Sequence, residues 1–79
     1  MIAVREFNAT FAAWLRRNRT FAGLSSRELA DRIGVTDSAI SAWERGITSP
    51  TLHNALLLCW ALDVSLPDLE AQFRTEAPC

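Results

Sequence analysis

Two short helix-forming segments, joined by only three residues, constrain the fold of this chain more than any other feature. The first begins at a capping box, S-x-x-E, in which the side chains of Ser25 and Glu28 can each bond the backbone N–H of the other residue. It ends at Gly34, because glycine adopts the left-handed conformation that ends a helix at little cost. Thr36 caps the second segment and Gly46 ends it. Two helices joined by so short a turn cross at a steep angle.

Three more helices are predicted around this pair, at about residues 8–19, 52–62 and 66–74. The first carries Phe7, Phe11 and Leu15 at intervals of four, the spacing of one helix face. Thr51 and Ser65 are placed to cap the other two. No period-two alternation and no hairpin dipeptide predicts a strand. The sequence therefore predicts an all-α fold, a compact bundle of five short helices.

The length of the chain limits it to one small domain. Its 79 residues are 49% hydrophobic and 22% charged, which is typical of a folded domain. We expect the domain to span residues 1–74 and residues 75–79 to form a loose tail. No apolar run approaches the ~18 residues of a membrane span, and the N-terminus lacks the long apolar stretch of a signal peptide. The expected location is therefore the cytoplasm, without membrane contact.

Charge is distributed unevenly along the chain, although its net value is only −1. Residues 15–53 contain six arginines and four acids, whereas residues 54–79 contain one arginine and four acids. All eight basic residues are arginine, the better group for two-pronged contacts to phosphate or guanine. GC-rich codon use is the simpler explanation of that bias. The middle of the chain is the candidate for nucleic-acid contact, but the net charge does not favour it.

The middle of the chain resembles the lambda-repressor/Cro type of helix-turn-helix domain, also called the XRE family. The matching segments are, in order, L-R-x-x-R, G-L-S-x-x-E-L-A, G-V-T, I-S-x-W-E-R-G, P-T-L and A-L-x-V-S-L-x-x-L. They cover residues 15–69, about two-thirds of the chain, without a gap. The resemblance implies a lambda-repressor-like bundle whose second and third helices form a helix-turn-helix. It also implies that the third helix enters the major groove of double-stranded DNA.

The resemblance assigns DNA contacts residue by residue. Base contacts fall on the start and outer face of the third helix, at Thr36, Asp37, Ser38, Ser41 and Ala42. Phosphate contacts fall around it, at Ser26, Arg45 and Thr48. Arg16 and Arg27 are further candidates for phosphate contact, and their alternative is a place on the solvated surface. The family usually has glutamine or arginine where Asp37 stands. Asp37 can accept a hydrogen bond from a cytosine amino group, or it can simply stabilise the helix dipole from the first turn.

Other residues are expected to have structural roles. Arg19 and Glu44 match an ion pair that, in the family, ties the third helix to the first. Trp43 shares a helix face with Ile40, so we expect it in the core rather than stacked on a base. Asp63 stands where the family usually has the glycine that ends the fourth helix, and we expect it to be left-handed.

No residue pattern indicates catalysis. A Ser-His-Asp or Cys-His set cannot be assembled, and there is no glycine-rich phosphate loop. His53 is the only histidine and has no second ligand at metal-binding spacing. Cys59 and Cys79 are interpreted as a buried small hydrophobe and a tail thiol rather than a disulfide. We therefore expect no enzyme activity, metal, cofactor or small-molecule ligand.

The predicted fourth helix presents an apolar stripe outside the expected core. Leu57 and Trp60 follow His53 along it, where the family usually places polar or charged residues. A monomer would normally avoid such a patch, and tryptophan is a common interface anchor. We therefore expect a two-fold homodimer, with Leu66 and Phe73 as further interface residues.

Two questions stay open at the level of sequence. Ile2, Val4 and Phe7 could fold over Trp60 and cover it, which would remove the argument for a dimer. The expected function is that of a sequence-specific DNA-binding transcriptional regulator, a small dimeric repressor on a palindromic operator. The alternative is a protein-interaction module, such as an antitoxin-like or anti-repressor protein, which the weak basic balance and Asp37 favour.

Overall fold

A computed structural model of the chain describes residues 3–74, and these residues form five α-helices and no strand. The helices are α1 (Val4–Phe21), α2 (Ser26–Ile33), α3 (Asp37–Glu44), α4 (Leu52–Leu62) and α5 (Leu66–Arg74). The predicted all-α bundle is confirmed, and α2 to α5 lie close to their predicted bounds. Residues 1–2 and the tail 75–79, which includes Cys79, lie outside the described residues.

The first helix is longer than predicted, because α1 begins at Val4 rather than at Asn8. Ala3 occupies its N-cap and makes no side-chain hydrogen bond to the helix, so the true start carries no capping signal. An aromatic contact packs this first part of α1 instead. Phe7 stacks on Phe73 of α5, with ring centroids 4.6 Å apart.

Capping bonds form at the starts of α2 and α3 as predicted. The Glu28 N–H donates to Ser25 Oγ at 3.0 Å, and the Ser25 N–H donates to Glu28 Oε1 at 2.9 Å, which completes the capping box. The bond from the Ser25 backbone N–H lowers the pKa of the Glu28 carboxyl. Thr36 Oγ1 accepts from the backbone N–H of Ala39 at 3.1 Å. The turn between α2 and α3 is therefore fixed on both sides by local bonds.

The end of α4 confirms the prediction for Asp63. This residue has φ 58° and ψ 42°, and it is the one non-glycine residue with positive φ among residues 3–74. The Asp63 N–H donates to Trp60 O at 3.3 Å, and the Val64 N–H donates to Cys59 O at 2.9 Å. These two bonds form a Schellman motif, the ending in which glycine is usual. Asp63 therefore adopts a conformation that costs more for an aspartate than for glycine.

The core draws side chains from all five helices. Its most buried members are Phe11, Trp14, Leu15, Leu29, Ala30, Ile33, Ile40, Trp43, Leu58, Cys59, Leu62 and Leu69. Trp43 lies in this core, as predicted, and so does Cys59, whose thiol pKa is raised by burial. α5 contributes only Leu69 to this set.

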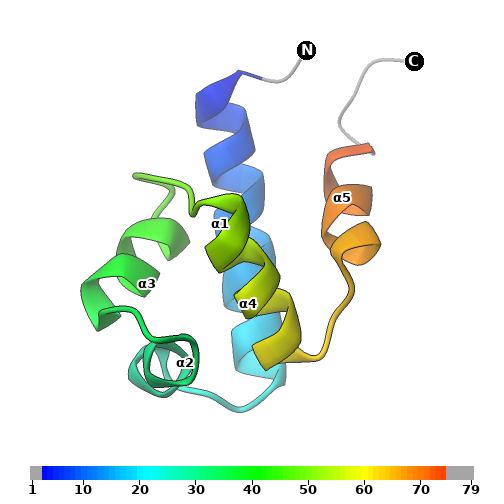
Figure 1. Cartoon of the computed structure of the whole chain (residues 1–79). Coiled ribbons are helices and arrows are strands. Elements are labelled where there is room, and N and C mark those ends of the chain that lie inside the picture. Colours follow the sequence, from blue (N-terminus) through cyan, green and yellow to red (C-terminus); the bar gives the residue numbers. More distant parts are fainter. Residues whose placement is uncertain (1–2, 75–79) are drawn as a thin grey trace.

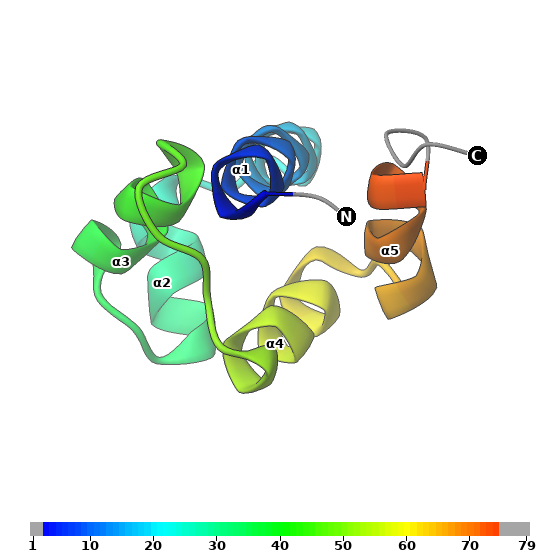
Figure 2. The same ribbon diagram turned by 90° about the horizontal axis from the view of Figure 1, so that it is seen from above.

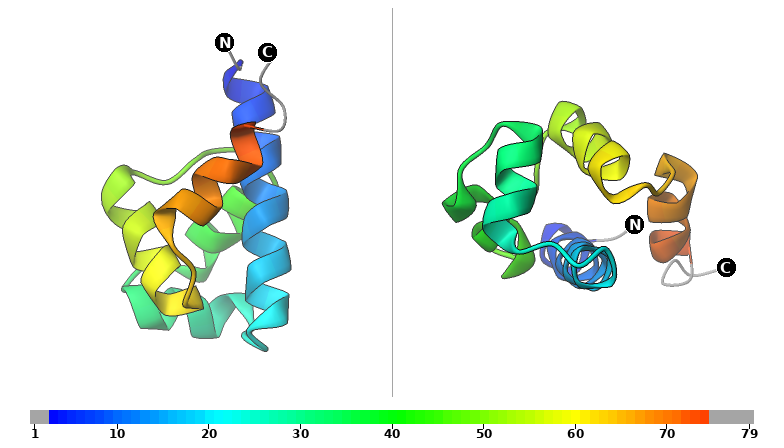
Figure 3. Two further views of the ribbon diagram at one scale, coloured as in Figure 1. Left: turned by 90° about the vertical axis from the view of Figure 1, so that its right-hand side faces the viewer. Right: turned by 90° about the horizontal axis from the view of Figure 1, so that it is seen from below.

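The arrangement of the helices leaves the α2–α3 pair at one edge of the molecule. α2 and α3 lie on one side of α1 and α4, and α5 lies on the other side (Figures 1 and 2). Figure 3 shows the end of α5 beside the first turns of α1, in agreement with the stacking of Phe7 on Phe73. α3 is therefore accessible to a large partner that approaches from the side opposite α5.

Candidate nucleic-acid interface

α3 buries one face and presents the other outward. Ile40 and Trp43 lie in the core, with exposed fractions of 0% and 6%. The predicted base-contacting residues are on the accessible side: Thr36, Asp37 and Ser38 are exposed, and Ser41 and Ala42 are half-buried. All five side chains are short, so the outer side of α3 is slim. A helix of this shape fits the major groove, which is ~12 Å wide.

A hydrogen bond joins the starts of α2 and α3. Ser26 Oγ donates to Asp37 Oδ1 at 2.6 Å, with Ser26 half-buried and Asp37 exposed. The family resemblance implies different contacts for these residues, a phosphate for Ser26 and a base for Asp37, and the structure brings them together. Asp37 Oδ2 makes no hydrogen bond within residues 3–74. One oxygen of the carboxylate is thus fixed, and the other is open to a donor.

The other end of α3 is held on α1 by Arg19. Its Nε and Nη2 donate to the two carboxylate oxygens of Glu44 at 2.5 and 2.9 Å, and its Nη1 donates to Leu24 O at 2.9 Å. The side chains of Arg19 and Glu44 are only 20% and 10% exposed. The hydrogen bond to Glu44 raises the pKa of Arg19 above its usual value. Both ends of α3 are therefore fixed to neighbouring helices before any ligand binds.

Exposed arginines surround this fixed helix. Arg16 donates from Nη2 to Glu44 O at 2.6 Å, a bond that uses one of the five N–H donors of its guanidinium. Arg27 and Arg45 are exposed and make no ion pair within residues 3–74, and Thr48 is exposed in the loop after α3. The predicted phosphate-contacting residues therefore lie on the surface near both ends of α3.

A comparison with known proteins identifies the family to which this arrangement of helices belongs. The sequence pattern of a protein family described as Helix-turn-helix (HTH_3) matches residues 15–69. The chain belongs to the HTH_3 helix-turn-helix family. No protein of curated function matches the chain.

Solved structures agree with this HTH_3 assignment. The restriction-modification controller protein C.AhdI from Aeromonas hydrophila is 36% identical, with a TM-score of 0.76 over 80% of this chain and 96% of that one. The clp gene regulator ClgR from Corynebacterium glutamicum is 27% identical, with a TM-score of 0.81 over 95% of this chain and 77% of that one. An HTH_3 family transcriptional regulator from Vibrio cholerae is 27% identical, with a TM-score of 0.77 over 92% of this chain and 39% of that one. The family and these structures identify the chain as a DNA-binding regulator.

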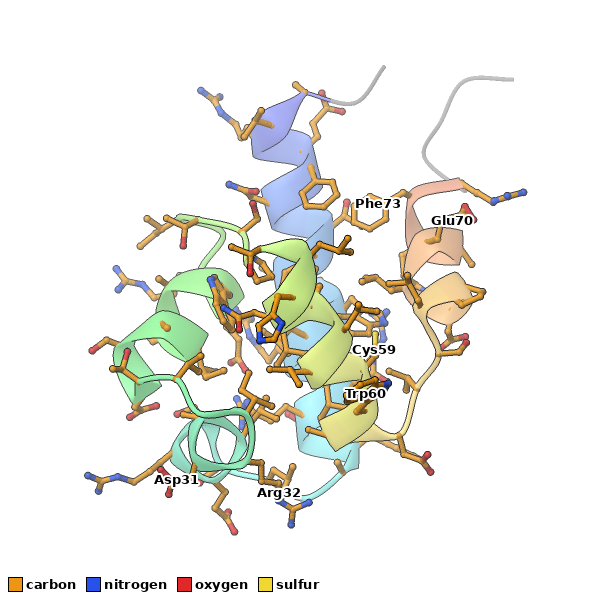
Figure 4. The ribbon with its side chains drawn as sticks, viewed as in Figure 1. Asp31, Arg32, Cys59, Trp60, Glu70 and Phe73 are labelled. Atoms are coloured by element: carbon orange, nitrogen blue, oxygen red, sulfur yellow. The ribbon has the colours of Figure 1, made fainter. Side chains whose placement is uncertain are left out.

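The predicted dimer residues of this HTH_3 domain have different environments. Trp60 is 75% exposed and Leu66 is 39% exposed. Leu57, which was predicted to lie outside the core, is half-buried and packs against it, because α4 is apolar on nearly all sides. Phe73 faces α1 in Figure 4, well away from Trp60 in that view, and it stacks on Phe7. The large exposed apolar residues of α4 are therefore Trp60 and, at the other end of the helix, Leu52.

The N-terminal residues do not cover Trp60. Phe7 packs on Phe73 and Phe11 instead, with ring centroids 4.6 and 6.5 Å apart, and Val4 is 76% exposed. Ile2 lies outside the described residues. The alternative in which the N-terminal residues cover Trp60 is therefore wrong for Val4 and Phe7, the two of them that the structure describes.

Neither a membrane span nor a metal cluster is found in the described part of the HTH_3 domain. None of its helices is long and apolar enough to cross a membrane. Within residues 3–74, no three His, Cys, Asp or Glu side chains are grouped so that they could hold a metal ion. His53 is exposed in the first turn of α4.

One basic residue near the interface, Arg5, was not predicted from the sequence. Arg5 is part of α1 only because the helix begins at Val4 rather than at Asn8. It lines the same groove as Arg16 and Arg45. Arg5 lies eleven residues before Arg16, a spacing that places both on one face of a helix. That spacing would have indicated Arg5 only if the predicted helix had included residues 4–7.

Proposed function

We propose that this HTH_3 chain is a small repressor that binds a specific sequence in double-stranded DNA and acts by occupying a promoter. The observation that carries the proposal is the slim, exposed face of α3, with Arg27 near one end and Arg45 at the other. In this function α3 lies in the major groove while the arginines contact phosphates beside it. C.AhdI, a controller protein, and ClgR, a gene regulator, support this assignment by their similarity. The repressor would act in the cytoplasm and catalyse no reaction.

The contacts divide into those that select a sequence and those that bind any sequence. Asp37 Oδ2 accepts from a cytosine amino group, the hydroxyls of Ser38 and Ser41 bond base edges, and the Ala42 methyl group meets a thymine methyl group. Thr36 lies beside them at the helix start. Phosphates are contacted by the second set, Arg16, Ser26, Arg27, Arg45 and Thr48.

The repressor acts as a two-fold homodimer on a palindromic operator. Trp60, at 75% exposed, is a large apolar group left in water. At the start of α4, a groove of about 400 Å³ opens between α1, α4 and α5, lined mainly by apolar side chains that include Phe7, Leu52, Leu66 and Phe73. Trp60 is not part of its lining, so the dimer would cover two separate apolar features, Trp60 and this groove. A second copy that covers this surface removes apolar area from water. Two-fold symmetry then places the two α3 helices about one DNA turn apart, ~34 Å.

The test is binding to the DNA upstream of the gene that encodes this chain. A labelled duplex from that region is titrated at about 50 mM and about 200 mM salt, beside a shuffled duplex of the same length and composition. The proposal requires tighter binding to the upstream duplex, with affinity that falls steeply as salt increases. Equal and weak binding to both duplexes would contradict it and would favour the protein-interaction alternative.

A further inference from the structure

A second stretch of basic surface lies on α1, outside the recognition helix. Arg5, Ala9, Ala12, Ala13 and Arg16 follow one another at i, i+4, i+7, i+8 and i+11, so they share one face of the helix. The three alanines carry only a methyl group each. The face is therefore a shallow trough with an arginine at each end, and the two arginines are separated by ~16 Å along the helix axis.

The end of α3 forms the other wall of this trough. Gly46 lies so close to α1 that a Cβ atom there would be 3.6 Å from Asn8 O and 3.8 Å from Ala9 Cα. Gly46 is therefore next to Ala9, and Arg45, the residue before it, lines the same groove as the three alanines. Together the two helices enclose a groove of about 400 Å³, which we call the α1–α3 groove. In Figure 1 the end of α3 lies level with the middle of α1, and Figure 2 shows the two helices next to each other.

The charge in the α1–α3 groove is not neutralised by the protein. Its lining has three arginines, Arg5, Arg16 and Arg45, and one acid, Glu44. Both carboxylate oxygens of Glu44 are already bonded to Arg19, which is not part of the lining. Arg5 and Arg45 make no ion pair within residues 3–74. Guanidinium groups without an ion-pair partner can bind a phosphate group by donating two hydrogen bonds to two of its oxygens.

We propose that the α1–α3 groove is a DNA backbone site, in which Arg5 contacts a phosphate that flanks the bases read by α3. The inference rests on the proposed function. It is supported by continuity, because the groove begins at Arg45, directly after the last turn of the recognition helix. The row of arginines is also long enough to follow several phosphates of one strand, since these recur every ~3.4 Å along the DNA axis. Arg5 gives affinity and no sequence preference, because phosphates carry no base identity.

The experiment compares Arg5→Ala with the wild-type chain on the upstream duplex and on its shuffled control, across a series of salt concentrations. We expect Arg5→Ala to bind both duplexes about fivefold more weakly and to lower the salt slope by about 0.9, the value for one lost phosphate contact. Arg5→Lys should keep most of the slope because it keeps the charge. Arg74→Ala, which removes an exposed arginine of α5 paired with Glu70, is the matched control and should bind like the wild type.

The outcomes separate this site from the proposed function. Arg5 is exposed, so the variant should melt like the parent, and circular dichroism checks this. If the wild type binds the upstream duplex and Arg5→Ala binds it with the same affinity and slope, the α1–α3 site is overturned and the proposed function stands. An equal loss in Arg74→Ala would also overturn the site, because the effect would then follow net charge alone. If the wild type binds neither duplex, both proposals fail together.

Discussion

Ser26 and Asp37 are bonded to each other, with 2.6 Å between Ser26 Oγ and Asp37 Oδ1, although one residue starts α2 and the other starts α3. The bond restrains the side chain of Asp37 before DNA arrives. A restrained acceptor loses less rotamer freedom on binding than a mobile one. In the proposed function Ser26 is therefore a positioning residue for the open oxygen of Asp37. Because its one O–H is donated to Asp37, a phosphate contact at Ser26 would use its backbone N–H at the start of α2.

This relationship predicts how sequence preference changes. Asp37→Asn should shift the preference at one base pair from cytosine toward adenine, because asparagine can make a two-pronged contact to adenine. Ser26→Ala should weaken the preference at the same base pair by roughly 1 kcal/mol, without moving it elsewhere. Binding to duplexes that differ only at that position measures both effects. Unchanged preference in both variants would leave Asp37 as a residue that only stabilises the dipole of α3.

The ion pair of Arg19 and Glu44 predicts a stability effect. Glu44→Ala should lower the free energy of unfolding by on the order of 3 kcal/mol, because it leaves a sheltered guanidinium without its partner. Glu44→Gln, which keeps the size and one acceptor oxygen, should lose less. Urea denaturation followed by circular dichroism measures both variants. A Glu44→Ala variant that unfolds at the wild-type urea concentration would show that the ion pair does not stabilise the domain.

The left-handed conformation of Asp63 predicts a stabilising substitution. Asp63→Gly should raise the free energy of unfolding by about 1 kcal/mol, since glycine adopts φ 58° without a Cβ clash. For a domain of this size that is a rise in melting temperature of roughly 4–8 °C. Asp63→Ala is the control and should lower the melting temperature instead. A lower melting temperature for Asp63→Gly would contradict the argument, because the flexibility of the unfolded chain would then outweigh the relief of strain.

The exposed face of α4 predicts an oligomeric state. The wild-type chain should sediment as a dimer at micromolar concentration, and Trp60→Glu should sediment as a folded monomer, because a charge cannot be buried at the centre of an apolar interface. Val4→Glu changes an equally exposed residue, 76% against 75%, and should remain a dimer. A monomeric wild type, or a dimeric Trp60→Glu variant, would remove α4 as the interface.

The parts of the fold that were predictable from sequence are those with local signals. The bounds of α2 and α3 follow from the capping bonds at Ser25 and Thr36, which join residues three apart. The start of α1 has no such signal, because it packs through a contact between Phe7 and Phe73 at opposite ends of the chain. Arg5 was missed for the same reason.

The candidate site shows a similar division between local and long-range information. The resemblance named Ser26 and Asp37 separately, but their hydrogen bond depends on how α2 and α3 cross. The burial of Leu57 was not predictable from spacing, because α4 is apolar on nearly every face and its pattern does not single out a core side. Relationships between elements had to come from the structure.

The most direct test of α3 as a reader of DNA sequence is selection of binding sites from a pool of random duplexes by the wild-type chain. We expect an enriched motif with two-fold symmetry, whose half-sites are centred about one helical turn apart, about 10–10.5 base pairs. The same selection with Asp37→Asn should return the motif altered at one position in each half-site. A pool that shows no enriched sequence after selection, while the chain still binds duplexes through charge, would contradict the account.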